Sequence, residues 1–167
     1  MTEQNAEEMV ETQSRKYPLA PRLRRLFAVL IDSVLMAFLL APFGTILGVD
    51  QLQSFILEGE IIPIGLLFKM HMGLFVCFLL LNGFLLFRYG QTIGKRLLKI
   101  AIATENFQVP EFNRLILFRS LPFFVARAIP GLNLINLVDS FLIFREDRRC
   151  LHDMIAGTQV IDISQAG

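Results

Sequence analysis

Residues 24–43 read RRLFAVLIDSVLMAFLLAPF, an apolar stretch that begins with two arginines and is interrupted by a single carboxylate, Asp32. Its length is close to the ~20 apolar residues that a helix needs to cross the hydrocarbon core of a bilayer. Arg25 and Asp32 are seven positions apart. In a helix they share one face, with a rise of about 10 Å between them. The sequence therefore predicts a membrane-spanning helix that carries an acidic side chain below its basic end.

The composition of the chain indicates an integral membrane protein. Hydrophobic residues make up 54% of the 167 positions, and phenylalanine alone fills 16 of them. This apolar share is higher than that of ordinary soluble domains, so the lipid bilayer is the first expected partner. The formal net charge is only +1, and no basic patch of the kind that binds DNA or RNA stands out. No nucleic-acid partner is therefore expected.

The charges that flank the apolar segments predict a topology. Spans are expected from about Leu26 to Leu47 and from about Leu66 to Phe87. The intervening residues 48–61, GVDQLQSFILEGEI, contain three acids and no basic residue, which is typical of a loop on the outside. Basic residues precede the first span and follow the second: Arg15, Lys16, Arg22, Arg24, Arg25, Arg88, Lys95, Arg96 and Lys99. By the positive-inside rule, these flanks face the cytoplasm.

Residues 114–144 form a third apolar segment, which is too short to cross the bilayer twice. Two crossings need about 40 residues, whereas this segment has 31 and is broken by Pro122 and by Pro130-Gly131. A single crossing would place the basic residues that follow it on the outside, against the positive-inside rule. We therefore expect a helical hairpin that turns within residues 128–133 part-way across the bilayer, shielded by the two spans. Both termini would then be cytoplasmic.

Two short segments have the pattern of β-strands. Residues 99–112, KIAIATENFQVPEF, begin with alternating side chains, and residues 158–164, TQVIDIS, are rich in β-branched ones. A two-stranded ribbon is marginal alone and must pack on the helices. Thr92 is expected to cap a short amphipathic helix. The expected fold is an all-α membrane protein with two transmembrane helices, a Pro/Gly-broken helical hairpin and a small cytoplasmic β-ribbon, preceded by a flexible cytoplasmic tail over residues 1–21.

Asp32 is expected to face the protein interior and to find a cation there. An ionised carboxylate inside a span costs at least ~2.5 kcal/mol on insertion scales. Arg119 or Arg127 of the hairpin is the better partner, because Arg25 lies too far along the helix for a direct contact. Asp139 adds a second buried acid. Two interpretations remain open at this point: structural ion pairs that hold the helices together, or a cation or proton site.

The other polar residues give weaker signals. His71 is either an interfacial side chain of the second span or a proton relay. His152 stands beside Asp153 without further histidine or cysteine ligands, which is a weak metal signal; Asp153 is more typical of a helix cap or an ion-pair partner. Residues 90–96, GQTIGKR, lack the spacing of a phosphate-binding loop. No nucleophile or paired carboxylates appear, so we expect no enzyme activity, cofactor or metal.

Three segments, in this order along the chain, resemble the RDD family of bacterial membrane proteins: residues 24–32 (RRLFAVLID), 90–98 (GQTIGKRLL) and 148–161 (RRCLHDMIAGTQVI). The family is named for an arginine and two aspartates, which Arg25, Asp32 and Asp153 match. The resemblance covers about residues 22–161, and a membrane domain is expected over residues 22–163. Ile93 stands where proline is common in the family, and Lys99 where glycine often occurs. Both departures lie in the cytoplasmic loop.

The resemblance implies a location in the bacterial inner membrane and a role in transport, with monovalent cation/proton exchange proposed for some members. The candidate ion- or proton-coupling residues are Asp32, Arg25, Asp153, Arg119, Arg127 and Asp139, with His71 and His152 as weaker candidates. The alternative is a non-catalytic membrane assembly or regulatory subunit in which the charged cluster is structural or binds a partner. Because two spans and a hairpin enclose little volume, we expect a homo-oligomer or a membrane protein partner.

Overall fold

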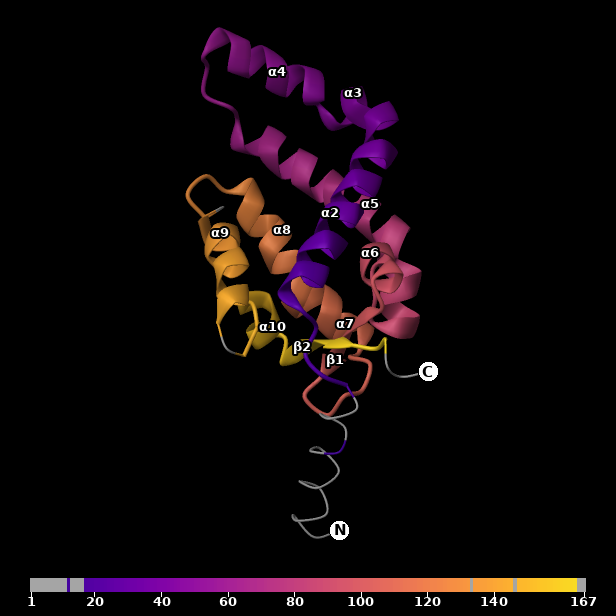
Figure 1. The fold of residues 1–167 in the computed structure, drawn as a ribbon. Coiled ribbons are helices and arrows are strands. Elements are labelled where there is room, and N and C mark those ends of the chain that lie inside the picture. The colour runs from indigo at the N-terminus through magenta and orange to yellow at the C-terminus, as the bar shows by residue number, and fades with distance from the viewer. Residues whose placement is uncertain (1–11, 13–16, 133, 146, 165–167) are drawn as a thin grey trace.

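Two long apolar helices dominate the computed structural model, which describes residues 12, 17–132, 134–145 and 147–164 (Figure 1). Most of the predicted tail, residues 1–11 and 13–16, lies outside the described residues. The first long segment, Arg22–Leu47, comprises α2 (Arg22–Leu40), a 3-10 turn η1 (Ala41–Phe43) and α3 (Gly44–Leu47). The second is α5 (Ile64–Tyr89). Both predicted spans are thus confirmed as helices of 26 residues each, long and apolar enough to cross a membrane.

The apolar side chains of these two helices face outward. In the most apolar 18-residue stretch of each segment, only 6% of the residues are buried by the rest of the chain. The core helices of a soluble protein bury such side chains. Pro42 lies in the 3-10 turn of the first segment, where its missing amide hydrogen interrupts the α-helical ladder.

The predicted connection between the two spans, residues 48–61, contains a helix that sequence reasoning did not predict, α4 (Val49–Glu58). Glycines with positive φ stand at both of its ends, Gly48 at 89° and Gly59 at 69°. Gly48 ends α3 and Gly59 ends α4 in the left-handed conformation that glycine adopts without steric cost. In Figure 1, α4 lies at the end of the molecule opposite the strands.

The third apolar segment folds into two short helical arms. The first arm runs without a break through α7 (Phe112–Arg114), a π-helical segment η2 (Leu115–Ser120) and α8 (Leu121–Ala128). The second arm comprises α9 (Leu134–Phe141) and the 3-10 turn η3 (Leu142–Phe144). Asn133, in the predicted turn, lies outside the described residues. The arms are shorter than the two apolar segments described above.

Aromatic rings hold the first arm against α5. The ring of Phe124 lies 5.1 Å from that of Phe75 and 5.6 Å from that of Phe78, measured between centroids. Pro122 lacks the amide hydrogen that an α-helix donates four residues back, and the π-helical segment lies directly before it. The Ser120 hydroxyl donates to the Leu115 carbonyl oxygen at 3.0 Å. This wider turn belongs to the part of the arm that carries Arg119.

The predicted β-ribbon is confirmed: β1 (Ile100–Thr104) pairs antiparallel with β2 (Thr158–Asp162), and Ile102 lies opposite Val160. The ribbon packs on the helices, since Ile100 and Val160 join Ala20 and Ala28 in one buried cluster. The segment before α2 follows the outer edge of β2, where the Ala20 amide donates to the Val160 carbonyl at 2.9 Å. Two helices of five residues adjoin the ribbon, α6 (Ile93–Leu97) and α10 (Leu151–Ile155).

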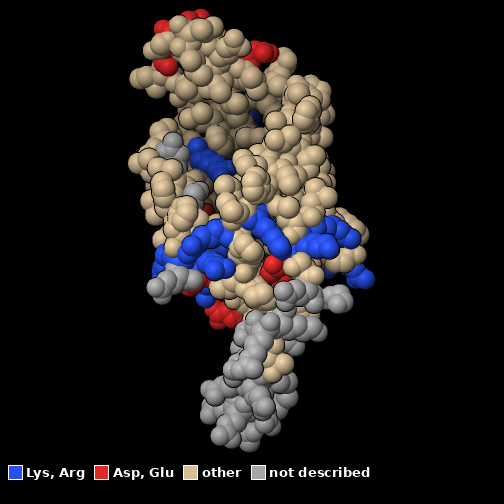
Figure 2. Space-filling model, in the orientation of Figure 1, with Lys and Arg blue, Asp and Glu red and all other residues tan. Residues whose placement is uncertain are grey.

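Charges are distributed unevenly along the long axis of the molecule. Figure 2 shows lysine and arginine side chains gathered in a band across its lower half, whereas acidic atoms mark the upper end around α4. The acids in the α4 region are Asp50, Glu58 and Glu60. Between the band and the upper end the surface is mostly uncharged.

Candidate functional site

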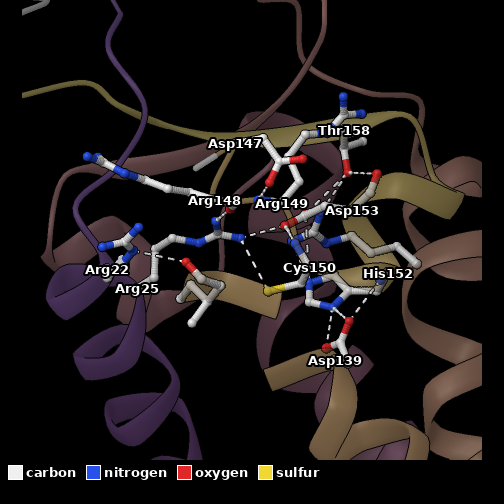
Figure 3. A network of polar contacts seen from close by, with 12 residues as sticks. Arg22, Arg25, Asp139, Asp147, Arg148, Arg149, Cys150, His152, Asp153 and Thr158 are labelled. Carbon is white, nitrogen blue, oxygen red and sulfur yellow. Dashed lines mark hydrogen bonds and ion pairs between the residues drawn. The ribbon is translucent and has the colours of Figure 1, made fainter. Parts of the chain in front are cut away.

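A buried ionic clamp joins α2 to the hairpin and to α10 (Figure 3). Arg25 and Arg119 bind opposite oxygens of the Asp153 carboxylate: Arg25 Nη2 lies 2.5 Å from Oδ2, and Arg119 Nη1 contacts Oδ1. Asp153 is fully buried, and each arginine is 7% exposed. Arg119 also donates to the Thr158 hydroxyl at 2.7 Å. We call Arg25, Arg119 and Asp153 the clamp.

The position of Asp153 at the third residue of α10 explains why it is fixed so firmly. Its Oδ2 accepts from the Cys150 amide at 3.3 Å, which forms a capping box at the start of the helix. Burial alone would favour the neutral acid, but Arg119, His152 and Arg25 outweigh it and hold the pKa of Asp153 well below its usual range. The carboxylate therefore stays ionised throughout the physiological pH range.

Asp139 joins the clamp through His152. The His152 Nδ1 lies 2.7 Å from Asp139 Oδ2, and the His152 backbone amide donates to Asp139 Oδ1 at 2.9 Å. On the other side of the ring, Arg119 Nη2 lies 3.2 Å from His152 Nε2. This geometry assigns the proton to Nδ1 and leaves Nε2 as the acceptor. Burial and the Arg119 charge lower the pKa of His152, so the ring is neutral at pH 7.

Asp139, Cys150 and His152 place three possible metal-ligand atoms within 4.8 Å of one another. Both nitrogens of the His152 ring already have protein partners. Burial raises the pKa of the Cys150 thiol to about 11, which disfavours the thiolate that binds metals. Arg25 Nη2 lies 3.9 Å from the Cys150 sulfur. These contacts favour a hydrogen-bonded cluster with adjacent guanidinium groups over a metal centre.

Asp32 lies in a separate polar site between α2 and α6. Its Oδ2 accepts from the Thr92 hydroxyl at 2.5 Å, and its Oδ1 accepts from the Gly94 amide at 2.8 Å. The prediction that Arg119 or Arg127 pairs with Asp32 is wrong. Within the described residues, no lysine or arginine nitrogen lies within 4.0 Å of this carboxylate. The start of α6 offers amide hydrogens that have no partner within the helix, and these take the place of a cation.

The close packing of α6 on α2 brings these donors to Asp32. A Cβ atom on Gly94 would collide with the backbone carbonyl of Ala28. Only glycine allows this approach. Asn82 of α5 supports the same turn from behind, because its side-chain oxygen accepts from the Ile93 amide at 2.9 Å. Asn82 is fully buried.

The remaining candidates lie apart from both sites. Arg127 is exposed, donates to Asn136 Oδ1 at 3.2 Å and covers the ring of Phe124. His71 lies 2.8 Å from the Leu67 carbonyl oxygen of its own helix. Sequence reasoning did not single out Lys95, which it named only among the basic residues that flank the spans. Lys95 is half-buried beside Gly94. The glycine was the available sequence signal that this segment packs closely against another element.

The chain matches the model of the RDD family over residues 19–157, a range that includes both polar sites. Searches of curated proteins and of solved structures find no match. Together with the two long apolar helices, the family match indicates a membrane protein.

Proposed function

Since the chain belongs to the RDD family, we propose that it is a bacterial inner-membrane transporter that exchanges a monovalent cation for protons at Asp32. The observation that carries this proposal is that the groups in direct contact with the Asp32 carboxylate are neutral. A hydroxyl and a backbone amide hold it in place, and no described basic nitrogen within 4.0 Å cancels its charge. An ionisable group on a membrane helix is expensive to insert and is functional by default.

The clamp is less suited to exchange. Asp153 is bound by two guanidinium groups, and its lowered pKa keeps it ionised. A cation that approached Asp153 would have to displace an arginine. The role of the clamp in the proposal is therefore structural: the clamp holds α10 and the hairpin against the start of α2.

The charge distribution supports a cytoplasmic position for both termini. The basic band coincides with the region of the ribbon and of α10, while the end around α4 is acidic (Figures 1 and 2). By the positive-inside rule α4 would then lie outside, and the short arms of the hairpin would enter the bilayer only part-way. Reporter fusions after Gly59 and after the C-terminal residue test this topology. Outside activity at Gly59 and inside activity at the C-terminus are expected; an outside C-terminus would contradict it.

The transport proposal is tested by substituting Asp32→Asn in protein purified into liposomes. The amide keeps the shape, since its oxygen can accept from Gly94 and its NH₂ can donate to the Thr92 hydroxyl. Asp162→Asn is the matched control, because Asp162 pairs with Arg24 at 2.7 Å in the ribbon, away from Asp32. With an acidic lumen that contains a pH-sensitive dye, external Na⁺, K⁺ or Li⁺ should make the lumen alkaline for wild type and for the control. Asp32→Asn should abolish this response.

The outcomes separate transport from a second candidate function. A wild type that responds to none of the three cations would refute exchange, and an Asp32→Asn protein that responds at the wild-type rate would remove Asp32 from the mechanism. The second candidate is a membrane assembly or regulatory subunit. The closed clamp favours it, because all three of its charges are satisfied within the chain. This role predicts a stoichiometric partner in material purified from native membranes.

A further inference from the structure

We infer that Lys95 is the internal cation of the proposed site: its ammonium group holds the proton that leaves when a monovalent cation binds beside Asp32. This inference rests on the proposed function and names the origin of the exchanged proton. Three observations carry it, namely the position of Lys95 between the clamp and Asp32, the lack of a direct partner for its amine among the described residues, and the charges that act on it.

The position follows from the packing of α6 on α2. Arg25, Ala28 and Asp32 share one face of α2, with the spacing i, i+3 and i+7. Gly94 packs on Ala28, the middle residue of the three. The side chain of Lys95, the next residue, therefore leaves the backbone between the clamp on one side and Asp32 on the other.

The Lys95 amine has no direct partner within the part of the chain that the structure describes. Among the described residues it forms no ion pair within 4.0 Å and no side-chain hydrogen bond within 3.5 Å, and its backbone amide donates to the Thr92 hydroxyl. Arg25 and Arg119, by contrast, are both bound to Asp153. Lysine is a compact charge on a flexible stem, and its pKa shifts readily on burial. The chain thus fixes two permanent cations and leaves a titratable one unpaired.

Burial and the surrounding charges together place the titration of Lys95 near pH 8. Burial lowers the pKa of Lys95 to about 8; the Arg119 and Arg25 charges lower it as well, whereas Asp32 on α2 and Asp153 on α10 raise it. α6 also packs on α5 and β1, and β1 (Ile100–Thr104) has no titratable side chain. Asp32 is the larger of the two contributions that keep the proton on Lys95.

This arrangement couples the two ions. A monovalent cation beside Asp32 cancels the charge that stabilises the Lys95 ammonium. One N–H bond of the ammonium then breaks, the electron pair stays on nitrogen, and the proton passes to water. One positive charge enters and one leaves, so the net charge of the site does not change. Binding of a proton to Lys95 reverses the step and expels the cation.

The test measures proton release and cation binding separately. Purified protein in mild detergent is titrated with NaCl, KCl or LiCl in weakly buffered solution at pH 8, with choline chloride as the ionic-strength control. A pH dye reports proton release and calorimetry reports binding. Wild type should release protons with each cation that binds, most strongly near pH 8. Lys95→Gln should bind the cation and release none. Lys99→Gln is the matched control, since Lys99 is exposed and four residues away; it should behave as wild type.

The outcomes distinguish failure of the inference from failure of the proposed function. If wild type binds no cation, the exchange proposal itself fails. If wild type binds and releases protons but Lys95→Gln releases equally, the proton comes from another group and the inference is overturned.

A second measurement keeps the inference testable if Lys95→Gln does not fold. Acylation of Lys95 in the wild-type chain, followed across pH by mass spectrometry, should show a midpoint near pH 8. Asp32→Asn should lower that midpoint, because it removes the larger of the two charges that retain the proton. A midpoint near 10.4, the value of a free lysine, would overturn the inference, and so would a midpoint that Asp32→Asn leaves unchanged.

Discussion

Neutralising the central carboxylate of the clamp should open the contact between α2 and α10. Asp153→Asn keeps the size of the side chain but leaves two guanidinium groups, each 7% exposed, without a counter-charge. Breaking a buried ion pair by removing one partner costs about 3 to 5 kcal/mol. Arg24→Gln is the control. Arg24 pairs with Asp162 at 2.7 Å, but its side chain is 42% exposed, and pairs of that kind contribute about 1 kcal/mol or less.

Cys150 provides a local probe of this opening. The residue is 6% exposed and its sulfur lies beside Arg25 in the clamp, so alkylation requires the clamp to open. Since each 1.4 kcal/mol is a factor of ten, a cost of about 3 to 5 kcal/mol should raise the alkylation rate of Cys150 in Asp153→Asn by roughly two to three and a half powers of ten. Arg24→Gln should raise it less than about tenfold. Cys77 in α5 serves as the internal reference within each sample. Similar Cys150 rates in the two variants would refute the clamp as a stabilising element.

The pH dependence of this protection has a defined sign. The pKa of Asp153 is lowered by folding, so its contribution is present above the unfolded value of about 3.9 and is lost only as pH falls towards the folded value. The contribution of Asp153 therefore leaves the protection of Cys150 from alkylation constant between about pH 5 and 8.

Four further outcomes are expected. Gly94→Ala should destabilise the fold by about 1 to 3 kcal/mol in SDS titrations followed by circular dichroism, because its Cβ would collide with Ala28; an unchanged midpoint would contradict the close contact. Lys99→Gly should stabilise the fold by up to about 1 kcal/mol, because Lys99 has a φ of 54°; Lys99→Ala should not. Folding lowers the pKa of His152, so its contribution is present above about pH 6.5 and is lost as pH falls through the folded value; His152→Gln should remove this loss. Native mass spectrometry should show a species larger than the 19.0 kDa chain, and an active monomer would exclude the expected oligomer.

The sequence predicted the elements whose signal is local. The two spans follow from apolar length, and the strands at Ile100–Thr104 and Thr158–Asp162 follow from their side-chain pattern. α4 was missed because its ends depend on the positive φ angles of two glycines and not on periodicity. Lys99 is an informative intermediate case. Its φ of 54° lies in the left-handed region that glycine adopts without steric cost, which agrees with the glycine that the family resemblance implies at this position.

The partners of the charged residues could be predicted only in kind. The free-energy cost of burying a carboxylate predicts that Asp32 needs a stabilising partner. That cost does not decide whether the partner is a cation or a set of neutral hydrogen-bond donors. The answer depends on the approach of α6 to Ala28, which is a tertiary contact. The same contact determines the place of Lys95. Asp153 was identified through the family resemblance and as a cap or ion-pair partner, whereas its simultaneous contact with Arg25 and Arg119 required the folded chain.

The contact between Arg25 and Asp153 spans 128 positions, and this separation sets an order of assembly. At a synthesis rate of about 5 to 20 residues per second, Arg25 waits roughly 6 to 26 s for its carboxylate. The strand that lines the Ala20 segment is made later still. During this interval α2 and α5 can enter the bilayer as independent helices. The N-terminal end of α2 then lacks both the Asp153 carboxylate and the neighbouring strand β2. The buried ion pair of Arg25 and the edge contact of Ala20 are therefore completed only when α10 and β2 have been made.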